Sequence, residues 1–84
     1  MKIVNFSLHS LLKFSILRRH GFNISEKEIN DCIQYPDNLS SGFNNRKIAQ
    51  KIIDEKHSIR VIFEETENEI IIITFYPVRS GRYE

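Results

Sequence analysis

The chain has 84 residues, of which 40% are hydrophobic and 27% are charged. This balance is ordinary for a folded protein and excludes a disordered, collagen-like or linker-rich chain. The formal net charge of +1 gives by itself no indication of a nucleic-acid partner. We expect one domain over residues 1–84.

The absence of certain sequence features indicates where in the cell the protein resides. The single cysteine, Cys32, cannot form an intramolecular disulfide, and a short chain without a disulfide framework is typical of the cell interior. No apolar run approaches the ~20 residues of a membrane span, and the first residues lack the apolar stretch of a signal peptide. We expect a cytoplasmic protein with no membrane partner.

Charges alternate along the chain in blocks. Residues 1–24 contain four Lys and Arg side chains and no acid. Residues 26–37 are mainly acidic, 46–60 are mainly basic, and acids gather again in 64–69. Folding could place the basic blocks on one face, or the surface could be mixed; the pattern leaves both open.

Two helices are predicted in the first half, after residues 3–6, which could form a short strand or an arm. The first should run from about Leu8 to His20, because Ser7 suits an N-cap and Gly21 suits a C-cap. The second should follow Ser25, since "SEKE" has the capping-box pattern, and end before Pro36. Helical spacing with Ile29 and Ile33 makes Cys32 a small core residue rather than a nucleophile.

The middle of the chain is harder to assign. Residues 36–45 are rich in turn formers. In residues 46–54, Ile48, Ala49, Ile52 and Ile53 fit a helix, whereas Ile48, Gln50 and Ile52 fit a strand. Periodicity alone does not decide, but the segment is short and precedes two clear strands, which favours a strand.

Those two strands, "SIRVIFEE" and "EIIIITFYP", should form a hairpin with its loop at residues 66–68. If Glu65 faces Glu69, Arg60 lies across from Thr74 and diagonally near Tyr76 on one face. The other face is then apolar and packs against the helices, as it holds Ile59, Val61, Phe63, Ile71, Ile73 and Phe75. We expect an α+β fold, with two helices on one side of a three- to four-stranded antiparallel sheet.

A candidate site follows from side-chain chemistry. Arginine offers a fixed fork of donors that matches phosphate, and a histidine or tyrosine can move a proton. Metal-independent ribonucleases use such groups. The candidate catalytic residues are His9, Lys13, Arg60 and Tyr76. Each also has an ordinary structural interpretation: His9 as a helix-surface residue, Arg60 as a solvated strand residue.

The C-terminal residues 78–84 extend this hypothesis. We expect them to lie against the domain, with Arg79, Arg82 and Tyr83 completing a phosphate-binding rim; the alternative is a disordered terminus. No metal or cofactor is expected, because Cys32 and the three histidines lack the spacing of metal ligands.

Several short motifs, in order, carry a resemblance to a known group of proteins. They are His9 at the start of the first helix, "LRRHGFNIS", "YPD", "HSIRVIFEE" and "ITFYPVRSGRY". In these the chain resembles small bacterial and archaeal domains related to the RelE and BrnT toxins of toxin–antitoxin systems.

The resemblance implies a helical N-terminal half on a twisted antiparallel sheet, with a strand at residues 46–54. It favours His9, Arg46, Arg60 and Tyr76 as site residues. Of these, Arg46 is expected to bind phosphate. The resemblance also implies an RNA-cleaving toxin with an antitoxin partner. The alternative is a non-catalytic module of the same fold that binds RNA or protein.

Overall fold

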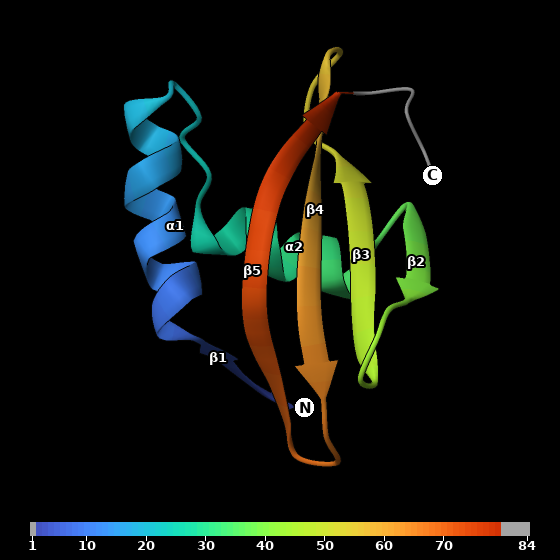
Figure 1. Ribbon diagram of the computed structural model, residues 1–84. Coiled ribbons are helices and arrows are strands. Elements are labelled where there is room, and N and C mark those ends of the chain that lie inside the picture. The colour runs from blue at the N-terminus through green and yellow to red at the C-terminus, as the bar shows by residue number, and fades with distance from the viewer. Residues whose placement is uncertain (1, 80–84) are drawn as a thin grey trace.

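The computed structural model describes residues 2–79 of the chain. In this range two helices lie against an open sheet of five strands (Figure 1). The elements in chain order are β1 (Ile3–Phe6), α1 (Leu8–Arg19), α2 (Glu26–Gln34), β2 (Asn38–Ser41), β3 (Arg46–Ile52), β4 (His57–Glu65) and β5 (Glu69–Arg79). The expected α+β class is confirmed.

The sheet is mixed, with strand order β1-β5-β4-β3-β2. Strands β2 to β5 pair in antiparallel fashion, as expected, and β1 adds to the far side of β5 in parallel. The described sheet therefore has five strands instead of three or four, and it is not purely antiparallel. The segment expected to be turns supplies β2, whose four residues are all exposed, so it has no burial periodicity to reveal it.

Both helices begin and end close to where the sequence predicts. The Ser7 side chain accepts a hydrogen bond from the backbone of Ser10 at the start of α1, and Gly21 follows the helix with φ of 88°. At α2 the predicted capping box of Ser25 and Glu28 is present. Residues 46–52 form the predicted strand.

The helices cover the sheet differently. In Figure 1, α2 crosses behind β3 and β4, whereas α1 runs alongside β5. Cys32 of α2 is fully buried, as predicted. The ring of Phe14 on α1 packs on that of Phe75 with centroids 4.7 Å apart. Within residues 2–79, neither helix has the length and apolarity needed to cross a bilayer.

The face of β5 that meets the helices differs from the expected one. Four of the six expected core residues, Ile59, Val61, Phe63 and Phe75, are buried. The prediction was wrong for Ile71 and Ile73, which are only half-buried. Their place in the core is taken by Ile72, with 0% of its surface exposed.

A β-bulge in β5 explains the difference. Glu65 pairs with Ile70 rather than Glu69, which shifts the expected register by one residue. The register shifts again between Ile62 and Phe63, which leaves Ile73 as the extra residue. Each one-residue shift exchanges the two faces of a strand, so Ile72 faces the core and Phe75 does so again beyond the bulge.

The bulge in β5 lies beside the junction between β1 and α1. Pairing of β1 with β5 ends at Phe6 and Ile72. Ser7 then donates from its backbone nitrogen to the carbonyl of Ile72, at 3.0 Å, and from its hydroxyl to the carbonyl of Ile73, at 2.9 Å. The N-cap residue of α1 thus also satisfies backbone groups of the bulged strand.

Candidate functional site

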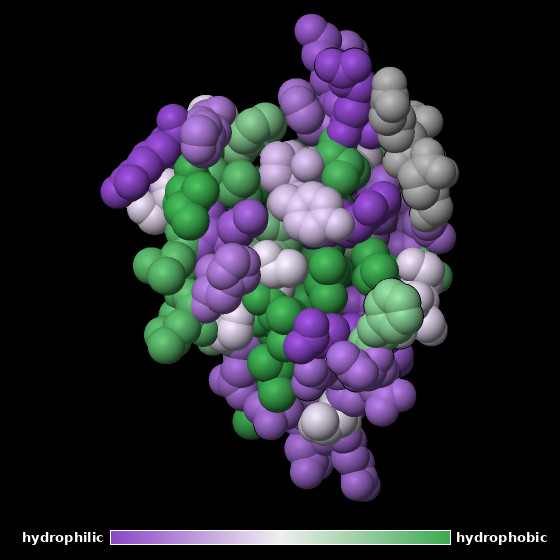
Figure 2. Space-filling model, viewed as in Figure 1, coloured by the Kyte–Doolittle hydropathy of each residue, from purple (hydrophilic) through white to green (hydrophobic). Residues whose placement is uncertain are grey.

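The side of the sheet facing away from α2 is its front face, carried by β3, β4 and β5. No element of residues 2–79 crosses it in Figure 1. Figure 2 shows hydrophobic side chains along its middle, with polar ones around them. Side chains of this face are therefore the ones that a large ligand could reach.

Arg60 and Tyr76 lie directly opposite each other on this face, on β4 and β5. The guanidinium carbon of Arg60 is 6.0 Å from the centroid of the Tyr76 ring, within the range of a cation–π contact. The sequence placed Tyr76 diagonally from Arg60; the two register shifts described above bring it directly across. The predicted pairing of these two residue types is therefore closer than expected.

Gln50 of β3 completes the row, and sequence reasoning did not identify it as a site residue. Its Oε1 atom accepts hydrogen bonds from Nε of Arg60 at 3.1 Å and from Nη2 at 2.9 Å. The side chain is 2% exposed, and its amide nitrogen donates to no acceptor in the described structure. The sequence did contain one indication of this role, because Gln50 is a polar residue between Ile48 and Ile52 on the same side of the predicted strand.

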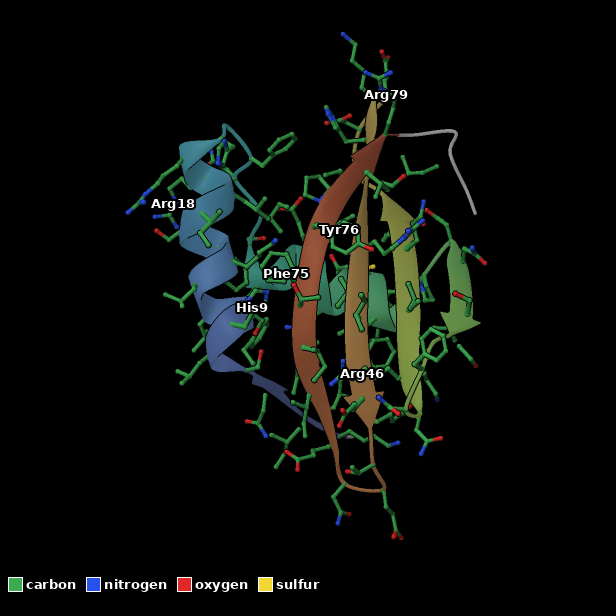
Figure 3. The ribbon with its side chains drawn as sticks, viewed as in Figure 1. His9, Arg18, Arg46, Phe75, Tyr76 and Arg79 are labelled. Atoms are coloured by element: carbon green, nitrogen blue, oxygen red, sulfur yellow. The ribbon has the colours of Figure 1, made fainter. Side chains whose placement is uncertain are left out.

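His9 reaches the same face from the first turn of α1. Its Nε2 atom is 3.1 Å from Oγ1 of Thr74, a residue 65 positions away in the chain. Thr74 precedes Tyr76 by two residues on β5, which corresponds to about 7 Å along a strand. Figure 3 shows His9 between α1 and β5, with Tyr76 nearby over the sheet. His9 therefore lies on the same face of the sheet as Tyr76 and Arg60, and these three residues are the candidate cluster.

Lys13 lies one helical turn after His9 and on the same side of α1. It is half-buried. This predicted catalytic residue thus places a positive charge beside His9.

The remaining predicted arginines lie elsewhere. Arg46 is at the lower end of the sheet in Figure 3, where its Nε atom is 3.3 Å from Oε1 of Glu64. Arg79 is at the upper end, opposite His57, and lines a hollow of about 440 Å³ together with Glu55 and Lys56. The predicted site residues Arg82 and Tyr83 lie outside the described residues.

Cys32 is not part of this cluster. Its Sγ atom is 3.8 Å from the carbonyl oxygen of Ile59, behind the sheet. Burial raises the pKa of the thiol to about 12, so the nucleophilic thiolate is not populated near neutral pH. This agrees with the structural role predicted for Cys32.

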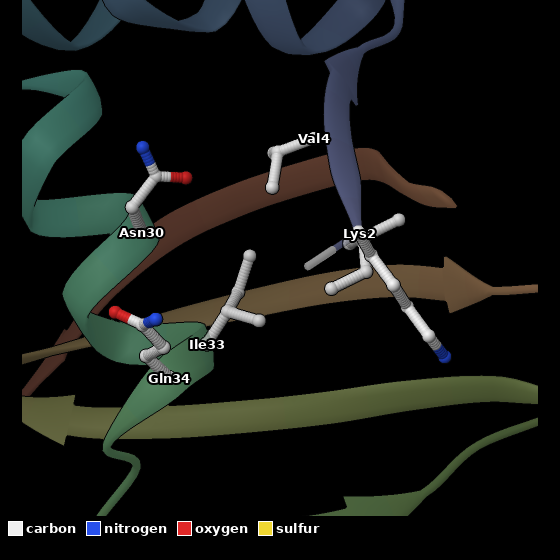
Figure 4. A pocket seen from close by; sticks show the side chains of 6 residues that line it. Lys2, Val4, Asn30, Ile33 and Gln34 are labelled. Carbon is white, nitrogen blue, oxygen red and sulfur yellow. The ribbon is translucent and has the colours of Figure 1, made fainter. Parts of the chain in front are cut away.

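A second hollow, of about 520 Å³, lies on the helix side of the molecule (Figure 4). Val4, Ile33 and Ile70 supply its apolar lining, and Asn30 and Gln34 lie along α2. Lys2, at the other wall, is already bound to Glu65 with Nζ to Oε2 at 2.6 Å. The hollow contains none of the predicted site residues.

Comparison of the chain with protein-family models, curated proteins and solved structures gives no significant match. The class of protein is therefore defined by its own architecture. It is an α+β domain with an open, mixed sheet whose front face carries Arg60, Tyr76 and the buried Gln50, with His9 of α1 placed against Thr74 on the same face.

Proposed function

We propose that the protein is a metal-independent ribonuclease of the RelE-like toxin type, and that the front face of its sheet binds single-stranded RNA. One observation carries this proposal: Arg60 and Tyr76 face each other on the front face, which no other element of residues 2–79 crosses, and His9 of α1 reaches Thr74 on the same face, two residues before Tyr76. An arginine, a phenol and an imidazole together offer phosphate binding, base stacking and proton transfer.

Phosphate binding is assigned to Arg60. Its guanidinium has five N–H donors, and Gln50 accepts from only two of its three nitrogens. The remaining donors suit a phosphate oxygen. The ring of Tyr76 suits stacking on a splayed base.

The reaction proposed is transesterification within the RNA. His9, as neutral imidazole, takes the proton of a ribose 2′-hydroxyl, and the 2′ oxygen bonds to the adjacent phosphorus. The bond from phosphorus to the 5′ oxygen breaks, and the Tyr76 hydroxyl supplies a proton to that oxygen. Arg60, supported by Lys13, stabilises the negative charge on the phosphate in the transition state. The products are a 2′,3′-cyclic phosphate and a 5′-hydroxyl.

An antitoxin partner and a cytoplasmic location belong to the same proposal. The second candidate is a non-catalytic binding module of the same fold. It is favoured by the contacts that Arg60 and His9 already make within the domain, with Gln50 and Thr74 respectively, because such contacts also suit a structural role.

The test uses purified protein and an end-labelled single-stranded RNA in buffer containing EDTA. We expect cleavage that leaves cyclic phosphate ends, and we expect none with an RNA whose reacting nucleotide is 2′-deoxy. His9→Ala and Tyr76→Phe should reduce cleavage at least a hundredfold while leaving binding, followed by fluorescence anisotropy, nearly unchanged.

Arg60→Ala should weaken both binding and cleavage. Arg18→Ala, which removes an exposed cation from the last turn of α1, is the matched control and should change neither by more than about twofold. Binding without cleavage in every buffer would favour the non-catalytic module. RNA binding unaffected by Arg60→Ala would place any interface elsewhere.

A further inference from the structure

The outward side of α1 exposes large apolar side chains that the proposed ribonuclease chemistry does not use. Leu8 is 81% exposed, Leu12 63%, Leu11 49% and Ile16 43%. At 100° per residue these four share one half of the helix, opposite Ser10, Phe14 and Leu17, which face the protein. We call this surface, formed by Leu8, Leu11, Leu12 and Ile16, the α1 patch. Figure 2 shows it as hydrophobic side chains at the left of the view.

Such a patch is unusual for a helix at the surface of a globular protein. A surface helix normally presents polar residues outward, whereas the outward side of α1 carries four large apolar side chains and the small Ser15. Four neighbouring side chains amount to a contiguous apolar area of a few hundred Å², a size that marks interaction sites on monomeric proteins. Nothing in residues 2–79 covers the α1 patch, as the exposed fractions show.

The charges around the patch indicate what covers it. Arg19 continues the line of Leu8 and Leu12 along the same side of the helix, and Arg18 lies beside it, both exposed. The last turn of α1 is thus basic, and the first turn has no acid. Residues 2–25 contain no acidic side chain, and the first acid after these arginines is Glu26. No neighbour within this segment can therefore pair with Arg18 or Arg19.

We infer that the α1 patch is the docking site of a partner protein, through an amphipathic helix whose apolar side chains are flanked by carboxylates. Leucines of the partner helix pack against the α1 patch, and its acids pair with Arg18 and Arg19. A second copy of this chain fits less well, because pairing α1 with α1 brings only basic residues together. The inference does not depend on RNA cleavage.

The test uses two labelled synthetic helical peptides, with leucines at positions i, i+3, i+4 and i+7. One carries glutamates beside the leucines, and the other carries lysines at the same positions. We expect the acidic peptide to bind the full chain at least tenfold more tightly, with NMR shift changes confined to residues 8–19. Leu12→Glu and Leu8→Glu should each weaken binding at least tenfold, and Arg19→Glu should remove the preference for the acidic peptide.

Leu39→Glu is the matched control, since this β2 leucine is similarly exposed, at 53%, and should leave binding unchanged. All the substituted residues are exposed, so circular dichroism should show native folds. Equal binding of the two peptides would overturn the inference, as would full binding by Leu12→Glu. The inference would also be overturned if neither peptide binds but the chain associates with itself, or binds anionic lipid vesicles, and Leu12→Glu abolishes that association.

Discussion

Gln50 and Arg60 are joined by two hydrogen bonds to a single atom, Oε1 of Gln50. They link β3 to β4 on the front face and fix the direction of the guanidinium. Within residues 2–79 no carboxylate pairs with this arginine, and its planar group is held in place, which suits an anion ligand.

Gln50→Glu should separate these two effects. A carboxylate still accepts from Arg60 but cancels its charge, and it removes the buried amide donor of Gln50, which has no acceptor within residues 2–79. We expect a thermal midpoint unchanged or raised, and roughly tenfold weaker RNA binding at low salt, as for loss of one charge-assisted hydrogen bond. Gln34→Glu, the same change at an exposed site on α2, is the control. Undiminished binding by Gln50→Glu would mean that Arg60 does not contact the RNA.

Glu65 should make stability depend on acid pH. Hydrogen bonds from Lys2 and Lys47 lower the pKa of Glu65 from 4.5 to about 2. A lowered folded-state pKa adds stability above the unfolded value, and this stability is lost as the pH falls from about 4.5 to about 2.

The thermal midpoint of Glu65→Gln should therefore lie below that of the original protein at pH 6, and the two should converge near pH 2. Two partly exposed ion pairs suggest a difference of about 1 kcal/mol at pH 6. Glu67→Gln, at an exposed position of the hairpin loop, should change the midpoint little. A constant difference between pH 6 and pH 2 would contradict the assignment.

Cys32 should be inert in the folded protein. Because burial raises its thiol pKa to about 12, iodoacetamide at pH 8 should label the native protein far more slowly than the guanidinium-unfolded one. Cys32→Ala should cost about 1 kcal/mol of unfolding free energy, as a small core truncation, and leave any RNA cleavage intact. Rapid labelling of the native thiol, or loss of activity in a folded Cys32→Ala variant, would show a reactive role.

Neighbouring isoleucines of β5 provide a test of the bulge. Ile72→Ala removes a fully buried side chain and should cost about 2–5 kcal/mol. Ile73→Ala, at the extra residue of the bulge, should cost less than half as much. Denaturant unfolding of both variants measures the two values. The opposite ranking would restore the regular hairpin that the sequence suggests.

Local rules explain why parts of this fold were predictable. Ser7, Ser25 with Glu28, and Gly21 mark helix ends by chemistry that acts within one turn, and the helices begin and end near them. The bulge was not predictable, because the residue that binds its carbonyls at Ile72 and Ile73 is Ser7, far away in the chain. Alternation alone gives no sign of an extra residue in a run of four isoleucines.

The candidate site was predictable in composition but not in arrangement. Arginine and tyrosine on adjacent strands suggested that Arg60 and Tyr76 lie near each other. Their direct pairing follows from the register shifts, and the contact of His9 with Thr74 depends on how α1 lies along β5. Gln50 was missed because its role comes from the neighbouring strand and not from its own segment.

The position of β5 between β1 and β4 has a consequence for folding kinetics. During synthesis β1 leaves the ribosome early but cannot pair until β5 has followed, since Ile3 pairs with Glu69. The nascent chain therefore carries α1 and β1 without their partner through most of translation. Contacts so distant in sequence slow folding, so we expect the domain to fold only after β5 has been synthesised. Until then, chaperones can bind the unpaired β1 and α1.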